Sequence, residues 1–439
     1  MRLPRVGLCW AAVAGLILVI LGHSGSWISA TLCERGSGSQ GRPEQGENTP
    51  EGLSGKHLPE LLKDLPLTVP SPRHAFTVAR NGSRFSVETS LDSSLQGFIH
   101  DLLSRSQTVR AAMVVLNPGT GQILAIADSE NGNGAGGGGL PLKAEYPAAS
   151  LFKIVAAAAA IEARGFTPES TMSFRGRKYT LYRSQLKPEK GDSGVRMSLR
   201  EAFSASINPI FGKIGIYALG KDLMEDYAQR FLFNQSIPFE LPLEVSPVDV
   251  PADDFGLAEI ASGFNKRTMI SPVHAALLSA AVANKGVIMK PWLIRAVKDD
   301  HGRVVYRAEP SRLARPITED TARKMRVLMH ETVITGTCRK AFRPLHRKES
   351  FSDIELGAKT GTINDSLDQY RVDWVTAYAI PEGEDGSICI SGLALHGEKV
   401  GIRVKDMVRA VIDNYFSSET AGKVGNGSDS RTQPADPDA

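Results

Sequence analysis

The stretch that decides the fold is 111–127, AAMVVLNPGTGQILAIA, in which two apolar, strand-like runs flank the turn sequence Asn117-Pro118-Gly119-Thr120-Gly121. Two such runs around a Pro-Gly turn predict a β-hairpin. Three further strand candidates follow near the other end of the chain, at 356–363, 372–380 and 388–395. The long segment between these groups is mostly helical or irregular. The pattern predicts an α+β fold: a five-stranded antiparallel sheet flanked by helices, with a large helical insertion.

Composition excludes several classes of protein. The chain has 439 residues, 42% of them apolar and 23% charged, as in a globular protein. Fifty-one basic and 48 acidic residues leave a net charge of +3, too weak a field to indicate nucleic acid as a partner. Four cysteines exclude a disulfide scaffold, and Cys338 and Cys389 are interpreted as buried free thiols. The histidines show no ligand spacing and Ala358 breaks a P-loop match, so we expect no metal and no cofactor.

The N-terminus has the pattern of a membrane anchor. Arg2 and Arg5 precede the apolar run 6–22, so the sequence predicts a signal anchor over 1–33 with a cytoplasmic N-terminus and the rest exported. A cleaved signal peptide is the alternative, because the apolar run is slightly long for a signal core and slightly short for a spanning helix.

The rest of the chain divides into a main domain and polar flanks. The segment 34–84, with a short helix near 57–64, is expected to be a disordered tether and short linker because most of it lacks an apolar period. The main domain is placed at 85–417, closing with a helix over 403–416. The polar segment 418–439 is expected to be a disordered tail.

The first candidate site is Ser150-Leu151-Phe152-Lys153, which opens the segment SLFKIVAAAAAIEARG. The alanines at 156–160 favour a helix and Gly165 ends it, so Ser150 is placed at the helix N-terminus. Lys153 follows one turn later on the same side, where its amine can reach the serine hydroxyl. Taken alone, this motif is better explained as a serine N-cap beside a surface lysine.

Two later motifs change that weighting. Ser206-Ile207-Asn208 precedes Pro209, which interrupts a helical pattern and can aim a hydroxyl and an amide into one cleft. Lys359-Thr360-Gly361-Thr362 lies on a predicted strand, where Gly361 leaves space for a substrate backbone to pair with the strand edge. Each motif is weak, but the ordered trio Ser-x-x-Lys, Ser-x-Asn, Lys-Thr-Gly is a strong signal.

Through this trio the sequence resembles the transpeptidase domain of penicillin-binding proteins, over roughly 85–417. It is similar to the class B members of this serine acyl-transferase and β-lactamase-like superfamily. Further matching segments are Thr89-Ser90-Leu91-Asp92, Leu95-Gln96, Thr120-Gly121-Gln122-Ile123-Leu124-Ala125, Ile270-Ser271-Pro272, Ala283-Asn284-Lys285-Gly286, Gly336-Thr337 and the strand of Trp374.

The resemblance implies a serine-type D-Ala-D-Ala transpeptidase that forms an acyl-enzyme on Ser150. It implies Lys153 as the neutral base, Ser206 as a proton relay and Asn208 as the group that orients Lys153. Lowering the Lys153 pKa from about 10.4 to about 7 requires roughly 4.6 kcal/mol, which burial and the charge of Lys359 could supply. The resemblance also implies an oxyanion hole from the backbone N–H groups of Ser150 and Thr362, and substrate binding by Lys359, Thr360, Gly361 and Thr362.

The implied partners are peptidoglycan stem peptides, β-lactam antibiotics as covalent inhibitors, and the membrane through the anchor; cell-wall synthesis proteins are also expected. The implied location is the bacterial cell membrane, crossed once, with the catalytic domain on the extracytoplasmic, periplasmic side. Three features depart from the family: Ala148-Ala149 where Pro-Gly is usual, the Gly-rich insert 131–139, and an N-terminal segment too short for a glycosyltransferase or a full class B module. They indicate a reduced, single-function enzyme.

Three alternatives stay open. A serine β-lactamase is disfavoured because no Glu-x-x-Leu-Asn string follows Asn208, as class A requires, and because class D usually has an aliphatic residue in place of Asn208. A D,D-carboxypeptidase differs only in its acceptor. A non-catalytic, β-lactam-sensing or wall-binding protein is opposed by the presence of every motif side chain.

Overall fold

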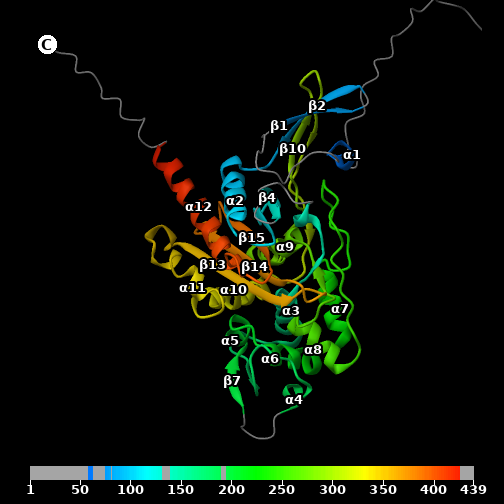
Figure 1. Cartoon of the computed structure of the whole chain (residues 1–439), viewed down its shortest axis with the longest axis vertical. Helices are drawn as coiled ribbons and strands as arrows, with labels where there is room; N and C mark the ends of the chain where they lie inside the picture. Colours follow the sequence, from blue (N-terminus) through cyan, green and yellow to red (C-terminus); the bar gives the residue numbers. More distant parts are fainter. Residues whose placement is uncertain (1–57, 63–74, 81, 131–138, 189–193, 426–439) are drawn as a thin grey trace, which may run out of the picture. The chain divides into compact units, whose positions relative to one another are not determined.

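The computed structural model describes residues 58–62, 75–80, 82–130, 139–188 and 194–425. Its central element is a five-stranded antiparallel sheet in the order β13-β14-β15-β3-β4, which confirms the predicted α+β fold (Figure 1). The strands are β3 (Arg110–Leu116), β4 (Ile123–Glu130), β13 (Ile354–Asn364), β14 (Arg371–Pro381) and β15 (Ile388–His396). The expected hairpin is therefore β3-β4, and the three late strand candidates are β13, β14 and β15.

Both faces of this sheet are covered by helices because its strands are apolar on both sides. On β14, Trp374 and Tyr378 pack into one core cluster, whereas Val375 and Ala377 pack into another. Helix α9 (Pro272–Ala283), buried along its whole length, crosses the first face. Helices α2 (Ser93–Ser104) and α12 (Val404–Gly425) lie against the second. Helix α10 (Glu319–Ile334) packs against β13, and His330 Nδ1 lies 2.8 Å from the carbonyl oxygen of Leu356 there.

The predicted helical insertion lies between β4 and β13. Its first long helix, α3 (Lys153–Arg164), buries all five consecutive alanines and ends at Gly165, whose φ of 68° is in the left-handed region. Small side chains allow α3 to pack closely against its neighbours, which include α7 and α8. Besides α9 and α10, the other helices of the insertion are α4 (Arg183–Leu186), α5 (Leu199–Ser204), α6 (Asn208–Lys213), α7 (Gly220–Arg230), α8 (Asp254–Ser262) and α11 (Arg339–Phe342). Between α6 and α7 lies the π-helical segment Ile214–Leu219, and 3₁₀ turns occupy Leu140–Leu142, Ala149–Phe152, Leu345–Arg347 and Glu349–Phe351.

Ordered structure begins before the predicted start at Phe85. Strand β1 (Ala75–Arg80) pairs with β2 (Ser83–Thr89), and β2 pairs with β10 (Ile294–Lys298) in a second sheet, β1-β2-β10-β11, whose last strand is β11 (Val304–Arg307). The expectation of a linker up to residue 84 is thus wrong for 75–80 and 83–84. Local sequence could not show this because β1 is mostly exposed and because β10, the strand that extends the sheet beside β2, lies about two hundred residues further along the chain. The short helix expected near 57–64 is α1 (Leu58–Leu62), whose leucines join the main core.

Three two-stranded sheets connect the loops: β5 (Tyr146–Pro147) with β8 (Met269–Ile270), β6 (Thr171–Phe174) with β7 (Val195–Ser198), and β9 (Ile288–Met289) with β12 (Arg312–Ala314). The last helix, α12, continues to Gly425, so the expected tail is wrong for 418–425. The anchor predicted over 1–33, the tether over 34–57, the Gly-rich residues 131–138 and the tail from 426 lie outside the described residues. Within the described ranges, no helix combines the length and apolarity that membrane crossing requires.

Candidate active site

Ser150 and Lys153 lie where a 3₁₀ turn, Ala149–Phe152, runs directly into α3. Ser150 is half-buried and Lys153 is completely buried. The Lys153 Nζ atom lies 2.7 Å from Ser150 Oγ, 2.8 Å from Asn208 Oδ1 and 2.5 Å from the Ser262 carbonyl oxygen. The last two partners can only accept hydrogen bonds, so they match the two N–H groups of a neutral amine. The third contact has Nζ donating to Ser150 Oγ; in the neutral amine that keeps the other two hydrogen bonds, the lone pair would face the serine hydroxyl instead, as a base that takes its proton requires.

The electrostatics favour the neutral amine. Burial lowers the pKa of Lys153 well below its ordinary value, and the positive charge of Lys359 lowers this pKa further. Both causes are those that the sequence predicts.

Ser206 lies in the break between α5 and α6, and Asn208 is the first residue of α6, in agreement with the interruption that Pro209 predicts. Ser206 has a φ of 56°, in the left-handed region that L-residues rarely adopt. The Asn208 Nδ2 group donates to the carbonyl of Tyr179 at 3.0 Å, which fixes the amide with its oxygen toward Lys153. The helix break thus places a hydroxyl and an oriented amide in one small region.

Lys359 lies on β13, the edge strand of the sheet. Its Nζ donates to Ser206 Oγ at 2.9 Å and to the Thr360 carbonyl at 2.8 Å, and the residue has no exposed surface. Burial lowers its pKa to about 7. The structure therefore places Lys359 behind Ser206 and not in the wall where a substrate carboxylate would contact it.

Gly361 has a different role from the one expected. A Cβ atom there would lie 3.2 Å from the Ala148 carbonyl oxygen, 3.2 Å from the Ala149 Cβ and 3.3 Å from the Trp374 Cβ. The space that a side chain would need is filled by the chain just before Ser150. Gly361 thus allows β13 to lie close to the turn that carries Ser150. The sequence predicts instead that the missing side chain leaves room for a substrate backbone.

A cavity of about 480 Å³ joins these motifs. Ser150, Ser206, Asn208, Thr360 and Thr362 all line it. The two serines and the strand are brought to one cavity although more than two hundred residues separate the first from the last. Lys153 and Lys359 contact the serines from below the cavity surface.

Other residues line the same cavity and were not singled out for a role from the sequence: Tyr179, Gly263, Phe264, Arg371, Asp373, Arg403 and Lys405. Thr337, which belongs to the matching segment Gly336-Thr337, lines it too, and its hydroxyl lies 2.7 Å from the Thr360 hydroxyl. Strand pairing brings in Asp373, which lies opposite Thr362 in the β13-β14 register. Arg403 immediately precedes α12, and no local motif marks it.

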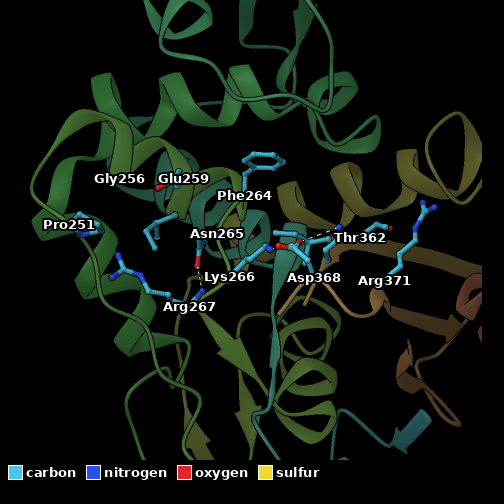
Figure 2. A pocket seen from close by; sticks show the side chains of 13 residues that line it. Pro251, Gly256, Glu259, Phe264, Asn265, Lys266, Arg267, Thr362, Asp368 and Arg371 are labelled. Carbon is cyan, nitrogen blue, oxygen red and sulfur yellow. Dashed lines mark hydrogen bonds and ion pairs between the residues drawn. The ribbon is translucent and has the colours of Figure 1, made fainter. Parts of the chain in front are cut away.

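A second cavity, of about 690 Å³, shares Phe264, Thr362 and Arg371 with the first (Figure 2). Lys266 and Asp368 form an ion pair of 2.5 Å within it. Arg267 and Arg371 lie toward its opposite ends (Figure 2). The first cavity therefore shares part of its wall with this second one, a groove that runs past Thr362 along the end of β13.

Comparison with known proteins agrees with this geometry. The family model for the penicillin binding protein transpeptidase domain matches residues 111–389. The peptidoglycan D,D-transpeptidase PbpA of Mycolicibacterium smegmatis is 23% identical over 355 residues, 73% of this chain and 70% of that protein.

Two solved structures show the same fold. The D,D-transpeptidase domain of a peptidoglycan glycosyltransferase from Eggerthella lenta is 24% identical, with a TM-score of 0.61, covering 77% of this chain and 84% of that one. Penicillin-binding protein A of M. tuberculosis, in an imipenem acyl-enzyme complex, is 23% identical with a TM-score of 0.60, covering 74% of this chain and 78% of that one.

Proposed function

The chain belongs to the penicillin-binding protein transpeptidase family, and from this premise we propose that it is a serine-type D,D-transpeptidase that cross-links peptidoglycan stem peptides. The observation that supports this function most directly is the contact of 2.7 Å between Ser150 Oγ and the buried Lys153 amine, in a cavity lined by the other motif residues.

In the first step, Ser150 Oγ attacks the carbonyl carbon of the penultimate D-Ala, and Lys153 takes the hydroxyl proton. The new C–O bond forms, the C–N bond to the terminal D-Ala breaks, and the leaving amine receives a proton through Ser206. Lys359 supports this relay because its Nζ donates to Ser206 Oγ. Free D-Ala leaves, and an acyl-Ser150 ester remains.

In the second step, an amine of a neighbouring stem peptide attacks the ester and restores the Ser150 hydroxyl. The backbone N–H groups of Ser150 and Thr362 stabilise the oxyanion in both steps, each contributing on the order of 3 kcal/mol. The groove beyond Thr362 receives the body of the stem peptide. A β-lactam acylates Ser150 in the same way and stays attached because its leaving group is tethered.

Labelling with a fluorescent penicillin tests this function. The full-length protein should acquire one label per chain, which peptide mapping assigns to Ser150. Ser150→Ala should abolish the label, and Lys153→Met should slow acylation by at least about a hundredfold because the base is lost. Lys285→Met, an exposed lysine paired with Glu384, is the matched control and should label normally.

The same preparation separates the neighbouring activities. Incubation with a pentapeptide donor and an amine acceptor should yield cross-linked product together with D-Ala. Release of D-Ala without cross-linking would identify a carboxypeptidase, and rapid nitrocefin turnover would identify a β-lactamase. Absence of any label on the folded protein would contradict the proposed function and favour a non-catalytic wall-binding protein.

We also propose that residues 1–33 anchor the protein in the bacterial membrane, with the catalytic domain on the extracytoplasmic side. Support comes from the apolar run after Arg2 and Arg5, and from the substrate, which is assembled into the wall outside the membrane. Cell-wall synthesis proteins are proposed partners on that side.

A further inference from the structure

Three cations line the catalytic cavity around Thr360 and Thr362. Arg371, Arg403 and Lys405 face it, and Asp373 is the single carboxylate among its lining residues. This wall therefore carries an excess of positive charge. An anionic group of the substrate is the ligand that such a wall attracts.

Asp373 connects one of these cations to the motif strand. The Thr362 hydroxyl donates to Asp373 Oδ1 at 3.3 Å. Arg403 donates to the same carboxylate through Nε, 2.7 Å from Oδ2, and through Nη2, 3.2 Å from Oδ1. Asp373 is 3% exposed, so the guanidinium is held beside Thr362 by a buried group. Pairing of Thr362 with Asp373 across β13 and β14 fixes this arrangement.

The charge state of Asp373 supports the link. Burial raises its pKa, but His396 and Arg403 outweigh burial and hold this pKa below the ordinary value. His396 Nε2 lies 3.6 Å from Asp373 Oδ2, a distance too long for a hydrogen bond. Arg403 is therefore the closer partner of the Asp373 carboxylate. A charged carboxylate keeps the guanidinium in place at neutral pH.

Arg403 retains hydrogen-bonding capacity toward the cavity. Its Nη1 group has no acceptor among the described residues, and its side chain is 31% exposed. Lys359, by contrast, is fully buried and donates to Ser206 and to the Thr360 carbonyl. Thr362 directs its hydroxyl hydrogen to Asp373, so the motif strand offers little charge of its own to a carboxylate.

We infer that Arg403 binds the C-terminal carboxylate of the D-Ala-D-Ala stem peptide, and that Asp373 is a positioning residue that holds the guanidinium beside Thr362. This inference rests on the proposed function. A guanidinium stays charged at every physiological pH and can donate two parallel hydrogen bonds to a carboxylate. The ring carboxylate of a penicillin would bind the same group.

Two penicillins that differ only in this charge test the inference. The second-order rate constant of acylation is measured with benzylpenicillin and with its neutral methyl ester. Arg403→Gln should slow acylation by benzylpenicillin about 10- to 100-fold, as expected for a lost charge-assisted hydrogen bond, and acylation by the ester less than about threefold. Arg403→Lys should recover part of the loss, because the charge returns without the planar fork.

Matched variants separate this role from a structural one. Arg409→Gln removes an arginine on α12 that pairs with Asp413 and does not line the cavity, and should leave both rates unchanged. Asp373→Asn should slow the acid more than the ester, because the guanidinium loses its anchor. Thermal unfolding of each variant shows that the protein is folded.

The outcomes are distinct. A wild-type protein that never labels Ser150 contradicts the proposed function itself. If the wild type labels, equal slowing of acid and ester by Arg403→Gln overturns the carboxylate role. A charge-selective loss with Arg371→Gln or Lys405→Gln but not with Arg403→Gln overturns it too, and assigns the carboxylate to another cation of the wall.

Discussion

Two lysines with lowered pKa values lie under Ser150 and Ser206. Both Lys153 and Lys359 are completely buried, and the dominant cause of each shift is burial. A buried lysine whose pKa is lowered decreases the free energy of unfolding, because the unfolded chain binds the lysine proton more tightly than the folded protein does. The proposed base and the lysine that supports the proposed relay therefore both come at the expense of stability.

This cost predicts how stability depends on pH. Lys359 has a folded pKa of about 7 against 10.5 in its ordinary state, so the unfolded chain binds more protons between these values. Its penalty is full below pH 7 and absent above 10.5. Lys359→Met should therefore be more stable than the wild type near neutrality, by about 2 kcal/mol after the loss of two hydrogen bonds.

Urea unfolding between pH 7.5 and 9.5 checks this expectation. The difference between variant and wild type should shrink by about 1 kcal/mol per pH unit as the pH rises. Lys285→Met is the control, because its hydrogen bond to Glu384 raises the Lys285 pKa and its charge persists through this window. If the difference in free energy of unfolding between Lys359→Met and the wild type did not change with pH, the pKa of Lys359 would not be lowered in the folded protein.

Ala149, the residue before Ser150, stands where glycine is usual in the family. Its φ is 49°, in the left-handed region where glycine is favoured and where an alanine costs about 1–2 kcal/mol. The alanine is buried, and its methyl group lies 3.2 Å from the position that a Cβ on Gly361 would take. The Ala-Ala pair could be noticed in the sequence, but the strained backbone and the compensating contact could not.

At the scale of elements, the strands of the main sheet could be predicted almost to their ends because their apolar runs are long and bounded by turn residues. The break at Pro209 and the stop at Gly165 were equally visible. The cationic wall was not, because Asp373 and Arg403 come together only through strand pairing and the start of α12. Short, exposed strands such as β1 carry too little periodicity to be found in the sequence.

The C-terminus of α8 positions the base, and this element can be tested with one glycine. Gly263, with φ of 65°, follows Ser262, whose carbonyl accepts from Lys153. A Cβ there would lie 1.9 Å from the Ala149 carbonyl oxygen. Gly263→Ala should therefore displace the nucleophile turn, destabilise the protein by more than about 3 kcal/mol and abolish penicillin labelling.

Gly165→Ala provides the comparison. Gly165 ends α3 with nearly the same φ, 68°, but a Cβ there meets nothing within 4 Å. Only the backbone cost remains, about 1–2 kcal/mol, and labelling should persist. Equal effects of the two substitutions on stability and labelling would mean that backbone conformation alone, and not the contact with Ala149, makes Gly263 necessary.

At the scale of the whole molecule, the catalytic domain and the predicted anchor place different demands on one chain. The described residues form a five-stranded sheet, a four-stranded sheet, three two-stranded sheets and a helical insertion, and the motif residues line one cavity among them. The N-terminal run after Arg5 is almost purely apolar, and we propose that it lies in lipid. The proposed reaction needs the cavity on the side of the membrane where the wall is built.

An exposed cysteine can report the side on which the domain lies. Ser236 is exposed in the loop between α7 and α8, whereas Cys338 and Cys389 are buried free thiols. In spheroplasts, a membrane-impermeant maleimide should label full-length Ser236→Cys without lysis. The wild type sets the background, including any contribution from Cys9 and Cys33. Labelling of Ser236→Cys that appears only after lysis would place the domain in the cytoplasm and contradict the proposed topology, while leaving the chemistry at Ser150 to be judged by penicillin binding.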